Sequence, residues 1–195
     1  MLDFNLRDVI SFLETQSPQS KLYIGCDSSC FKKNDEWYAE YVSVVVIHKN
    51  SKNGCKIFGR REYERDYGKK LNMPRLRLMN EVYKATNLYQ ELSPYIGTRS
   101  CEIHLDINSD PKYNSSIILK EAIGYVKGIT GLEPKIKPLS FASTCAADRH
   151  RWFGCFVEYP AWGILYHKNG FRGIRDHTAF TIRDDKWKKV ENKKN

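Results

Sequence analysis

Residues 22–30 read Leu-Tyr-Ile-Gly-Cys-Asp-Ser-Ser-Cys, and the rest of the chain can be organised around them. Their first half is apolar and rich in strand-forming residues, which is typical of a buried central strand. Asp27 follows where that strand should still lie inside the fold, and a buried carboxylate needs a cation beside it. Residues 102–108, Glu-Ile-His-Leu-Asp-Ile-Asn, repeat the design with Asp106. The pair predicts a shared metal site, and a turn capped by Asp27 and its two serines is the alternative.

The composition describes one globular domain with a basic surface. The 195 residues are 41% hydrophobic and 28% charged, which suits a single core in a soluble protein. The formal net charge of +9 favours an anionic partner, with nucleic acid ahead of a membrane surface. No apolar run reaches the roughly 18 residues of a membrane span, and no signal-type segment opens the sequence. We therefore expect a cytoplasmic protein.

The six cysteines contain no C-x-x-C pair and fall within apparent strands and helices. Cysteine in such places behaves as a small hydrophobic residue. Reduced thiols, and no zinc site, are the expectation.

Hydrophobic periodicity predicts the order β-β-β-α-β-α-β-α with an extra helix in front. The leading helix covers residues 3–14, with Asp3 or Asn5 as its N-cap. The predicted strands are residues 22–30, 37–49, 55–65, 101–108 and 135–137, and the remaining helices are residues 72–96, 114–130 and 140–150. Short polar turns join the first three strands, so they form an antiparallel meander. The fold class is therefore α/β, with a mixed five-stranded sheet flanked by helices.

Glu81 is a third candidate acid. It lies beside the apolar stripe of the helix at residues 72–96, where it can face the first strand. The alternative is an ordinary ion pair with Lys84 or Arg77 on its own helix.

Two further elements supply polar residues. Alternation places His104, Asp106 and Asn108 on one face of their strand. Asp148 lies near the end of the small-residue helix at residues 140–150, shortly before His150.

This order of elements, with these acids, resembles the ribonuclease H fold. More narrowly, the chain resembles the bacterial YkuK-type, ribonuclease H-like family over roughly residues 1–150. The matching pieces are Tyr-Ile-Gly-Cys-Asp-Ser (23–28), Arg-Leu-Met-Asn-Glu-Val (77–82), Ile-His-Leu-Asp-Ile-Asn (103–108), and Ile-Lys-Pro-Leu-Ser-Phe-Ala-Ser with Ala-Ala-Asp (136–148). The chain departs from the family pattern at Cys26 and Ser29, where Thr and Gln are expected.

The resemblance implies one carboxylate each from the first strand, the first core helix, the fourth strand and the last helix. Those places hold Asp27, Glu81, Asp106 and Asp148. Four carboxylates close together cannot all stay ionised without cations, because like charges raise one another's pKa. Two Mg²⁺ or Mn²⁺ ions about 4 Å apart would neutralise them and clamp a scissile phosphate.

In this scheme Asp27 bridges both ions, Asp106 and Glu81 hold one, and Asp148 holds the other. Supporting residues around the ligands are expected to orient them. The candidates are Ser28, His104, Asn108 and His150. Each histidine could instead be structural or could transfer a proton.

Residues 151–195 form a basic, aromatic-rich extension in which rings alternate with Lys and Arg. Rings that stack bases beside cations that hold phosphates would have this pattern. The alternative is an extension that packs its rings on the core. The expected nucleic-acid contacts are Arg60, Arg61, Arg151, Lys186, Lys188 and Lys189.

The sequence therefore predicts a divalent-metal-dependent nuclease that cuts RNA, an RNA–DNA hybrid or branched DNA. One alternative is a Holliday-junction-type resolvase, which a homodimer would favour because two symmetric cuts need two sites. Another is a non-catalytic nucleic-acid-binding or scaffold protein that retains the fold.

Overall fold

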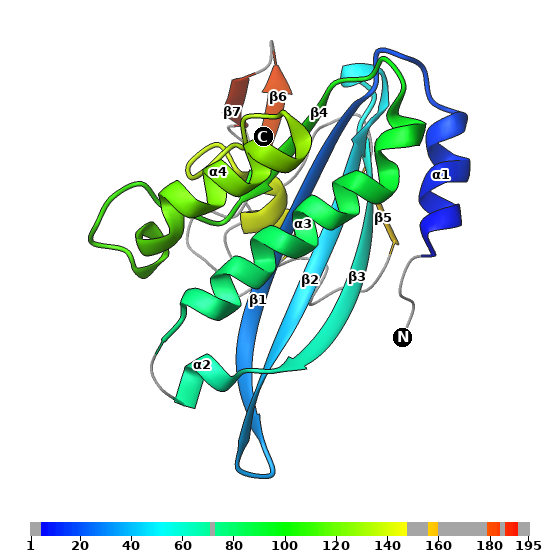
Figure 1. Ribbon diagram of the computed structural model, residues 1–195. Helices are drawn as coiled ribbons and strands as arrows, with labels where there is room; N and C mark the ends of the chain where they lie inside the picture. Colours follow the sequence, from blue (N-terminus) through cyan, green and yellow to red (C-terminus); the bar gives the residue numbers. More distant parts are fainter. Residues whose placement is uncertain (1–4, 71–72, 148–155, 160–178, 184–185, 191–195) are drawn as a thin grey trace, which may run out of the picture.

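A mixed β-sheet forms the centre of the computed structural model, which describes residues 5–70, 73–147, 156–159, 179–183 and 186–190 (Figure 1). Its strands are β1 (Lys21–Lys33), β2 (Glu36–His48), β3 (Cys55–Arg65), β4 (Cys101–Leu105) and β5 (Phe156–Tyr159). Their order across the described sheet is β4-β1-β2-β3-β5. The first three form the antiparallel meander, and β4 pairs with β1 in parallel. The predicted mixed α/β architecture is confirmed.

Helices cover one face of this sheet in Figure 1, with α3 crossing it obliquely. The α-helices are α1 (Leu6–Glu14), α2 (Tyr67–Lys70), α3 (Arg75–Ile96) and α4 (Leu119–Thr130). Asn5 caps α1, as one of the two predicted caps, and closes a reciprocal capping box with Asp8. A 3₁₀ turn, Asn114–Ile118, leads into α4, and a π-helical turn occupies Ala142–Ala146.

Apolar residues fill both sides of the sheet. On the helical side, Leu88 and Leu92 of α3 belong to one cluster with Ile24 of β1 and Ile103 of β4. On the other side, a smaller cluster joins strand residues to Phe141, Ala142 and Ala147. Alternating strand residues therefore face two different cores, which explains the near-continuous burial of β2 from Tyr41 to His48.

Several predicted elements differ in the structure, and the strand predicted at residues 101–108 ends at Leu105. Residues 135–137 form one parallel bridge, His104 with Lys135, and no full strand. Proline flanks them on both sides and lacks the N–H that would extend the ladder. The predicted helix at residues 140–150 is π-helical at Ala142–Ala146, and its end lies outside the described residues.

The alternative in which Asp27 closes a turn is wrong. Strand β1 continues to Lys33, with Asp27 paired to Val42 in the middle of the ladder. The predicted domain boundary after residue 150 stays a prediction. Strand β5, which follows that boundary, pairs with β3, and β6 (Ala179–Arg183) pairs with β7 (Lys186–Val190) in a separate sheet.

Among the described helices, none has the length and apolar character that crossing a membrane requires.

Candidate active site

Three carboxylates come from three elements that meet near one edge of the sheet. The parallel ladder between β1 and β4 ends at the pair Cys26 with Leu105, and Asp27 and Asp106 are the next residue of each chain segment. Glu81 lies on α3, the helix that packs across β1. Because Cys26 and Leu105 are paired, the two aspartates that follow them are neighbours across the two chain segments.

Glu81 is the most buried of these acids, with 5% of its surface exposed. Burial raises the pKa of its carboxyl well above the usual value, and the negative charges of Asp27 and Asp106 raise it further. Opposing that shift, the Ser28 hydroxyl donates a hydrogen bond to Oε1 and the Arg77 guanidinium lies 3.2 Å from the same oxygen. Both interpretations of Glu81 therefore hold: it faces β1 and it pairs with Arg77.

Asp106 is bound on one oxygen by two donors. Nζ of Lys137 lies 2.8 Å from Oδ1, and the Thr144 hydroxyl donates to Oδ1 over 2.9 Å. Lys137 comes from the bridging segment beside β4, and Thr144 comes from the π-helical turn. The orientation of the Asp106 carboxylate therefore depends on two segments outside β4, the bridging segment and the π-helical turn.

His104 holds that turn in place. It is 1% exposed; its Nδ1 accepts a hydrogen bond from the backbone N–H of Ala142 over 3.1 Å, and its Nε2 lies 3.3 Å from Glu102. Burial lowers the pKa of the imidazole, and Glu102 only partly offsets this. A neutral ring that accepts at Nδ1 and donates at Nε2 satisfies both contacts. These contacts favour a role for His104 in positioning the π-helical turn over a role in proton transfer.

Gly25 permits the close approach of the same turn. A Cβ atom built on Gly25 would lie 2.4 Å from the backbone nitrogen of Ser143, which no side chain could tolerate. Packing against the π-helical turn therefore explains why residue 25, two positions before Asp27, is a glycine.

Arg77 connects the acids to a pocket of about 340 Å³. Besides Glu81, its guanidinium binds the Ser28 hydroxyl, and its Nε lies 3.8 Å from the buried carboxylate of Asp66. Residues from α2, the start of α3 and the 3₁₀ turn line the pocket, among them Lys69 and Asn114. The pocket thus opens beside the residue that contacts Glu81.

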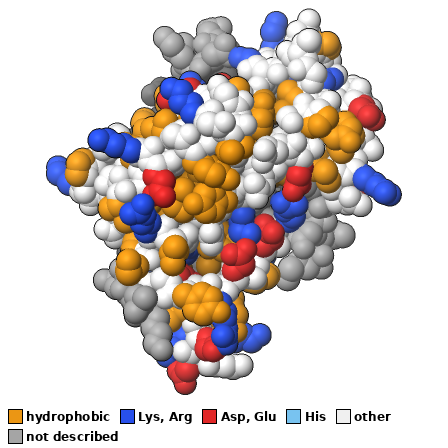
Figure 2. Space-filling model, in the orientation of Figure 1, with side chains coloured by type: hydrophobic (Ala, Val, Ile, Leu, Met, Phe, Trp, Pro, Cys, Tyr) orange, Lys and Arg blue, Asp and Glu red, His pale blue; other side chains and the backbone are white. Residues whose placement is uncertain are grey.

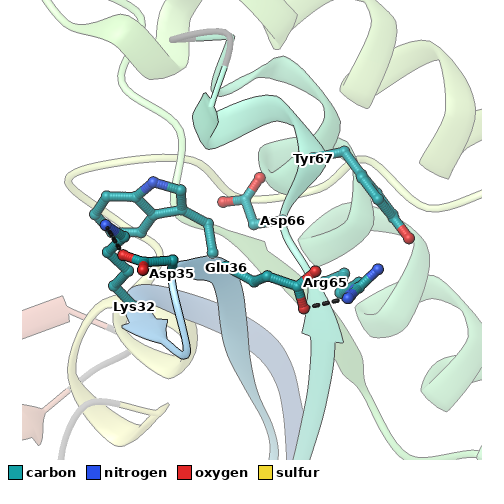
Figure 3. Close-up of a pocket in the computed structure, with 7 residues that line it drawn as sticks. Lys32, Asp35, Glu36, Arg65, Asp66 and Tyr67 are labelled. Carbon is teal, nitrogen blue, oxygen red and sulfur yellow. Dashed lines mark hydrogen bonds and ion pairs between the residues drawn. The ribbon is translucent and has the colours of Figure 1, made fainter.

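A second pocket, of about 380 Å³, lies at the tip of the β1–β2 hairpin (Figure 3). Its charged groups pair among themselves, Lys32 with Asp35 at 2.7 Å and Arg65 with Glu36. Asp66 lines this pocket too. Because these charges pair within the pocket, it is a weaker candidate for binding an anion than the pocket beside Arg77.

The remaining predicted residues fall into two groups. Asn108 lies beyond the end of β4, and its side-chain oxygen accepts a hydrogen bond from the backbone N–H of Asp110, so its supporting role stays a prediction. Arg60 and Arg61 form ion pairs with neighbouring glutamates. The side chains of Asp148, His150, Arg151, Lys186, Lys188 and Lys189 lie outside what the structure describes.

Sequence reasoning missed Lys137, Thr144 and Asp66. A signal for Lys137 was present, because parallel pairing of residues 135–137 beside β4 puts residue 137 next to Asp106. Thr144 had none, since its position depends on the π-helical turn and not on ordinary helical spacing.

The donor set suits a hard divalent cation, since it consists of carboxylate oxygens whose charges oppose one another. Within the described ranges, no group of three or more His, Cys, Asp and Glu side chains could hold a metal ion as placed. Cationic groups of the protein, Lys137 and Arg77, contact the acids instead. The ligand type of these residues therefore suits a divalent cation, whereas the described side chains as placed do not form a metal-binding group.

A family model described as ribonuclease H-like matches residues 5–151. That range includes Asp27, Glu81, Asp106 and Asp148. Comparisons with curated proteins and with solved structures gave no match.

Proposed function

The chain belongs to the ribonuclease H-like family, and on that premise we propose that it is a divalent-metal-dependent nuclease that hydrolyses phosphodiester bonds. The observation that carries the proposal is that Asp27, Glu81 and Asp106 come from three neighbouring elements and that the charges of the two aspartates act on the buried Glu81. A buried acid beside like charges is unfavourable for folding, and such arrangements concentrate at functional sites.

In this proposal Asp27, Glu81, Asp106 and Asp148 would hold Mg²⁺ or Mn²⁺. When bound, the two ions would supply the activation of water and the stabilisation of the leaving 3′-oxygen.

The protein's own residues prepare the acids for that role. Ser28 and Arg77 fix Glu81 against β1, because both donate to the same carboxylate oxygen. Thr144 orients Asp106, and His104 holds the turn that carries Thr144. These contacts reduce the conformational freedom of the ligands before substrate arrives.

Nucleic acid is the proposed substrate because it is a polyanion joined by phosphodiester bonds, and a basic protein attracts polyanions. The charge of +9 supports this, as does the alternation of rings and cations in residues 151–195. Figure 2 shows Lys and Arg interspersed with Asp and Glu over the helical face, without one continuous basic surface there. We therefore propose that the binding surface includes the extension.

The test is a panel of end-labelled RNA, DNA, RNA–DNA hybrid and four-way junction, incubated with Mg²⁺ or Mn²⁺. Wild-type protein should cut at least one of them in a metal-dependent way, and Asp27→Asn should not. The matched control is Asp35→Asn, which removes the same charge from a carboxylate whose side chain is 95% exposed in the hairpin turn. Equal cutting by Asp27→Asn and the control would refute the assignment, and cutting of the junction alone would favour the resolvase.

A further inference from the structure

We propose that the ammonium group of Lys137 competes with the divalent cation for Asp106, so that Lys137 sets how tightly the site binds metal. The inference rests on the proposed function, because it assumes that Asp106 is a metal ligand. It adds a residue and a control on metal binding that the family match does not contain.

Backbone hydrogen bonds between residues 135–137 and residues 103–107 fix the position of Lys137. Lys135 N–H donates to Ile103 O over 2.8 Å, and Lys137 N–H donates to Ile107 O over 3.0 Å. The segment therefore runs beside β4 and past its end, which brings residue 137 next to Asp106. A lysine held in this way differs from a surface lysine that reaches an acid by chance.

The contact is short and partly shielded from water. Nζ lies 2.8 Å from Oδ1, with the Lys137 and Asp106 side chains 34% and 21% exposed. Partial burial alone would lower the pKa of Lys137, but Asp106 and the charges of Asp27 and Glu81 outweigh it, so the pKa lies above the usual value. The group is therefore a permanent cation among the three acids.

A divalent ion and the Lys137 ammonium would compete for the carboxylate of Asp106. Two positive groups at one carboxylate repel each other, and that repulsion is strong where water is partly excluded. Thr144 is neutral, so its bond to the same oxygen carries no such conflict. Lys137 would therefore have to withdraw from Asp106 if a divalent ion bound there, which its flexible four-carbon stem permits.

The displaced ammonium has a second use. It stays beside the acids, where a lysine binds phosphate as a point charge. Removing Lys137 should therefore have two opposite effects: tighter metal binding without substrate, and weaker binding of the nucleic acid.

The experiment is a Mn²⁺ titration of the full-length protein, with free Mn²⁺ followed by electron paramagnetic resonance, for wild type and Lys137→Met. An opposite charge at contact distance shifts carboxylate equilibria by about tenfold or more, so Lys137→Met should bind Mn²⁺ about tenfold more tightly. Lys135→Met is the matched control, since it removes the same charge from the same segment where the neighbouring acid is Glu102. The control should stay within about threefold of wild type.

The outcomes separate the two proposals. Equal Mn²⁺ affinity in wild type and Lys137→Met, or weaker affinity in the variant, overturns the competition while the metal site stands. No Mn²⁺ binding by any of the three proteins overturns the metal site itself. Lys137→Gln repeats the test if Lys137→Met fails to fold, and Asp106→Asn in the Lys137→Met background should abolish the gain. Affinity for a labelled, uncleaved oligonucleotide should fall in Lys137→Met and not in Lys135→Met.

Discussion

At the residue scale, Glu81 is an acid whose burial is unfavourable for folding. The residue is 5% exposed, the charges of Asp27 and Asp106 raise the pKa of its carboxyl further, and Ser28 and Arg77 only partly compensate. In the unfolded chain Glu81 loses its proton near its ordinary pKa, whereas in the folded chain it keeps the proton to higher pH. The unfolded state therefore binds fewer protons above that pKa, and stability falls as pH rises.

Glu81→Gln should accordingly stabilise the fold while it abolishes activity. Gln keeps a hydrogen-bonding side chain of the same shape and removes the buried charge. We expect a rise of a few degrees in melting temperature, since about 1 kcal/mol shifts a chain of this size by about 2–4 °C. The gain should be larger at pH 8 than at pH 5. A melting temperature that falls by a similar amount at both pH values would make Glu81 a structural residue.

His104 predicts the opposite pH dependence. Burial depresses the pKa of its folded-state imidazole, so below about pH 6.5 the unfolded chain takes up a proton that the folded chain resists. Its contribution to stability is therefore present above that pH and is lost as the pH falls. His104→Asn keeps an acceptor for the Ala142 N–H and cannot titrate.

Urea unfolding of wild type and His104→Asn between pH 7.5 and 5 measures this. The variant should be less stable at pH 7.5, because it loses ring packing against Tyr23 and Phe141, and should lose less stability on acidification. Parallel curves for the two proteins would show that His104 does not titrate on unfolding.

At the element scale, the π-helical turn at Ala142–Ala146 connects the second core to the site. Its backbone is bound by His104 at one residue and approached by Gly25 at another, and it presents Thr144 to Asp106. Short π-helical segments are rare and occur frequently at functional sites. We expect this turn to orient the Thr144 hydroxyl toward Asp106.

Thr144→Val should test that inference. Valine keeps the shape and loses the hydroxyl, which lies within hydrogen-bonding distance of both Asp106 and the Ser140 carbonyl. We expect a loss of about 1 kcal/mol in unfolding free energy and a clear loss of single-turnover cleavage rate. Thr144→Ser, which keeps the hydroxyl, should retain most of the rate. A Ser variant as slow as the Val variant would show that packing, and not the hydrogen bond, matters.

These elements also show which features could be predicted. The meander, the parallel strand and the position of Asp27 within β1 followed from strand periodicity and from acids in apolar runs, because those signals are local. The π-helical turn did not, since serine and threonine hydroxyls there bind backbone carbonyls and change the helical period. Lys137 was not predicted because its segment was expected only as a short strand, and its contact with Asp106 depends on how that segment lies beside β4.

At the scale of the whole molecule, the charge is concentrated toward the end of the chain. Residues 151–195 contain ten Lys or Arg and five Asp or Glu, which is an excess of five within the total of nine. Arg60 and Arg61, by contrast, form ion pairs with Glu91 and Glu40, respectively. The extension is therefore the better candidate for phosphate contacts.

Replacing Lys186, Lys188 and Lys189 with Gln should weaken binding and flatten its salt dependence. Each lost phosphate contact lowers the slope of log affinity against log salt by about 0.7–0.9, the lower value for single strands. Lys33, Lys52 and Lys120, all exposed, form a control triple with the same change of charge. Fluorescence anisotropy at several salt concentrations measures both. Identical slopes for the two triples would leave the extension as a packing element.

The most direct measurement is single-turnover cleavage, beside affinity for the same oligonucleotide, for wild type and Asp106→Asn in Mg²⁺. Asp106→Asn removes one proposed ligand charge from a site where Lys137 and Thr144 remain. The account predicts that cleavage is abolished while binding persists or tightens, because negative charge has left the site. Cleavage by Asp106→Asn at the wild-type rate would contradict the assignment of these carboxylates as the catalytic centre.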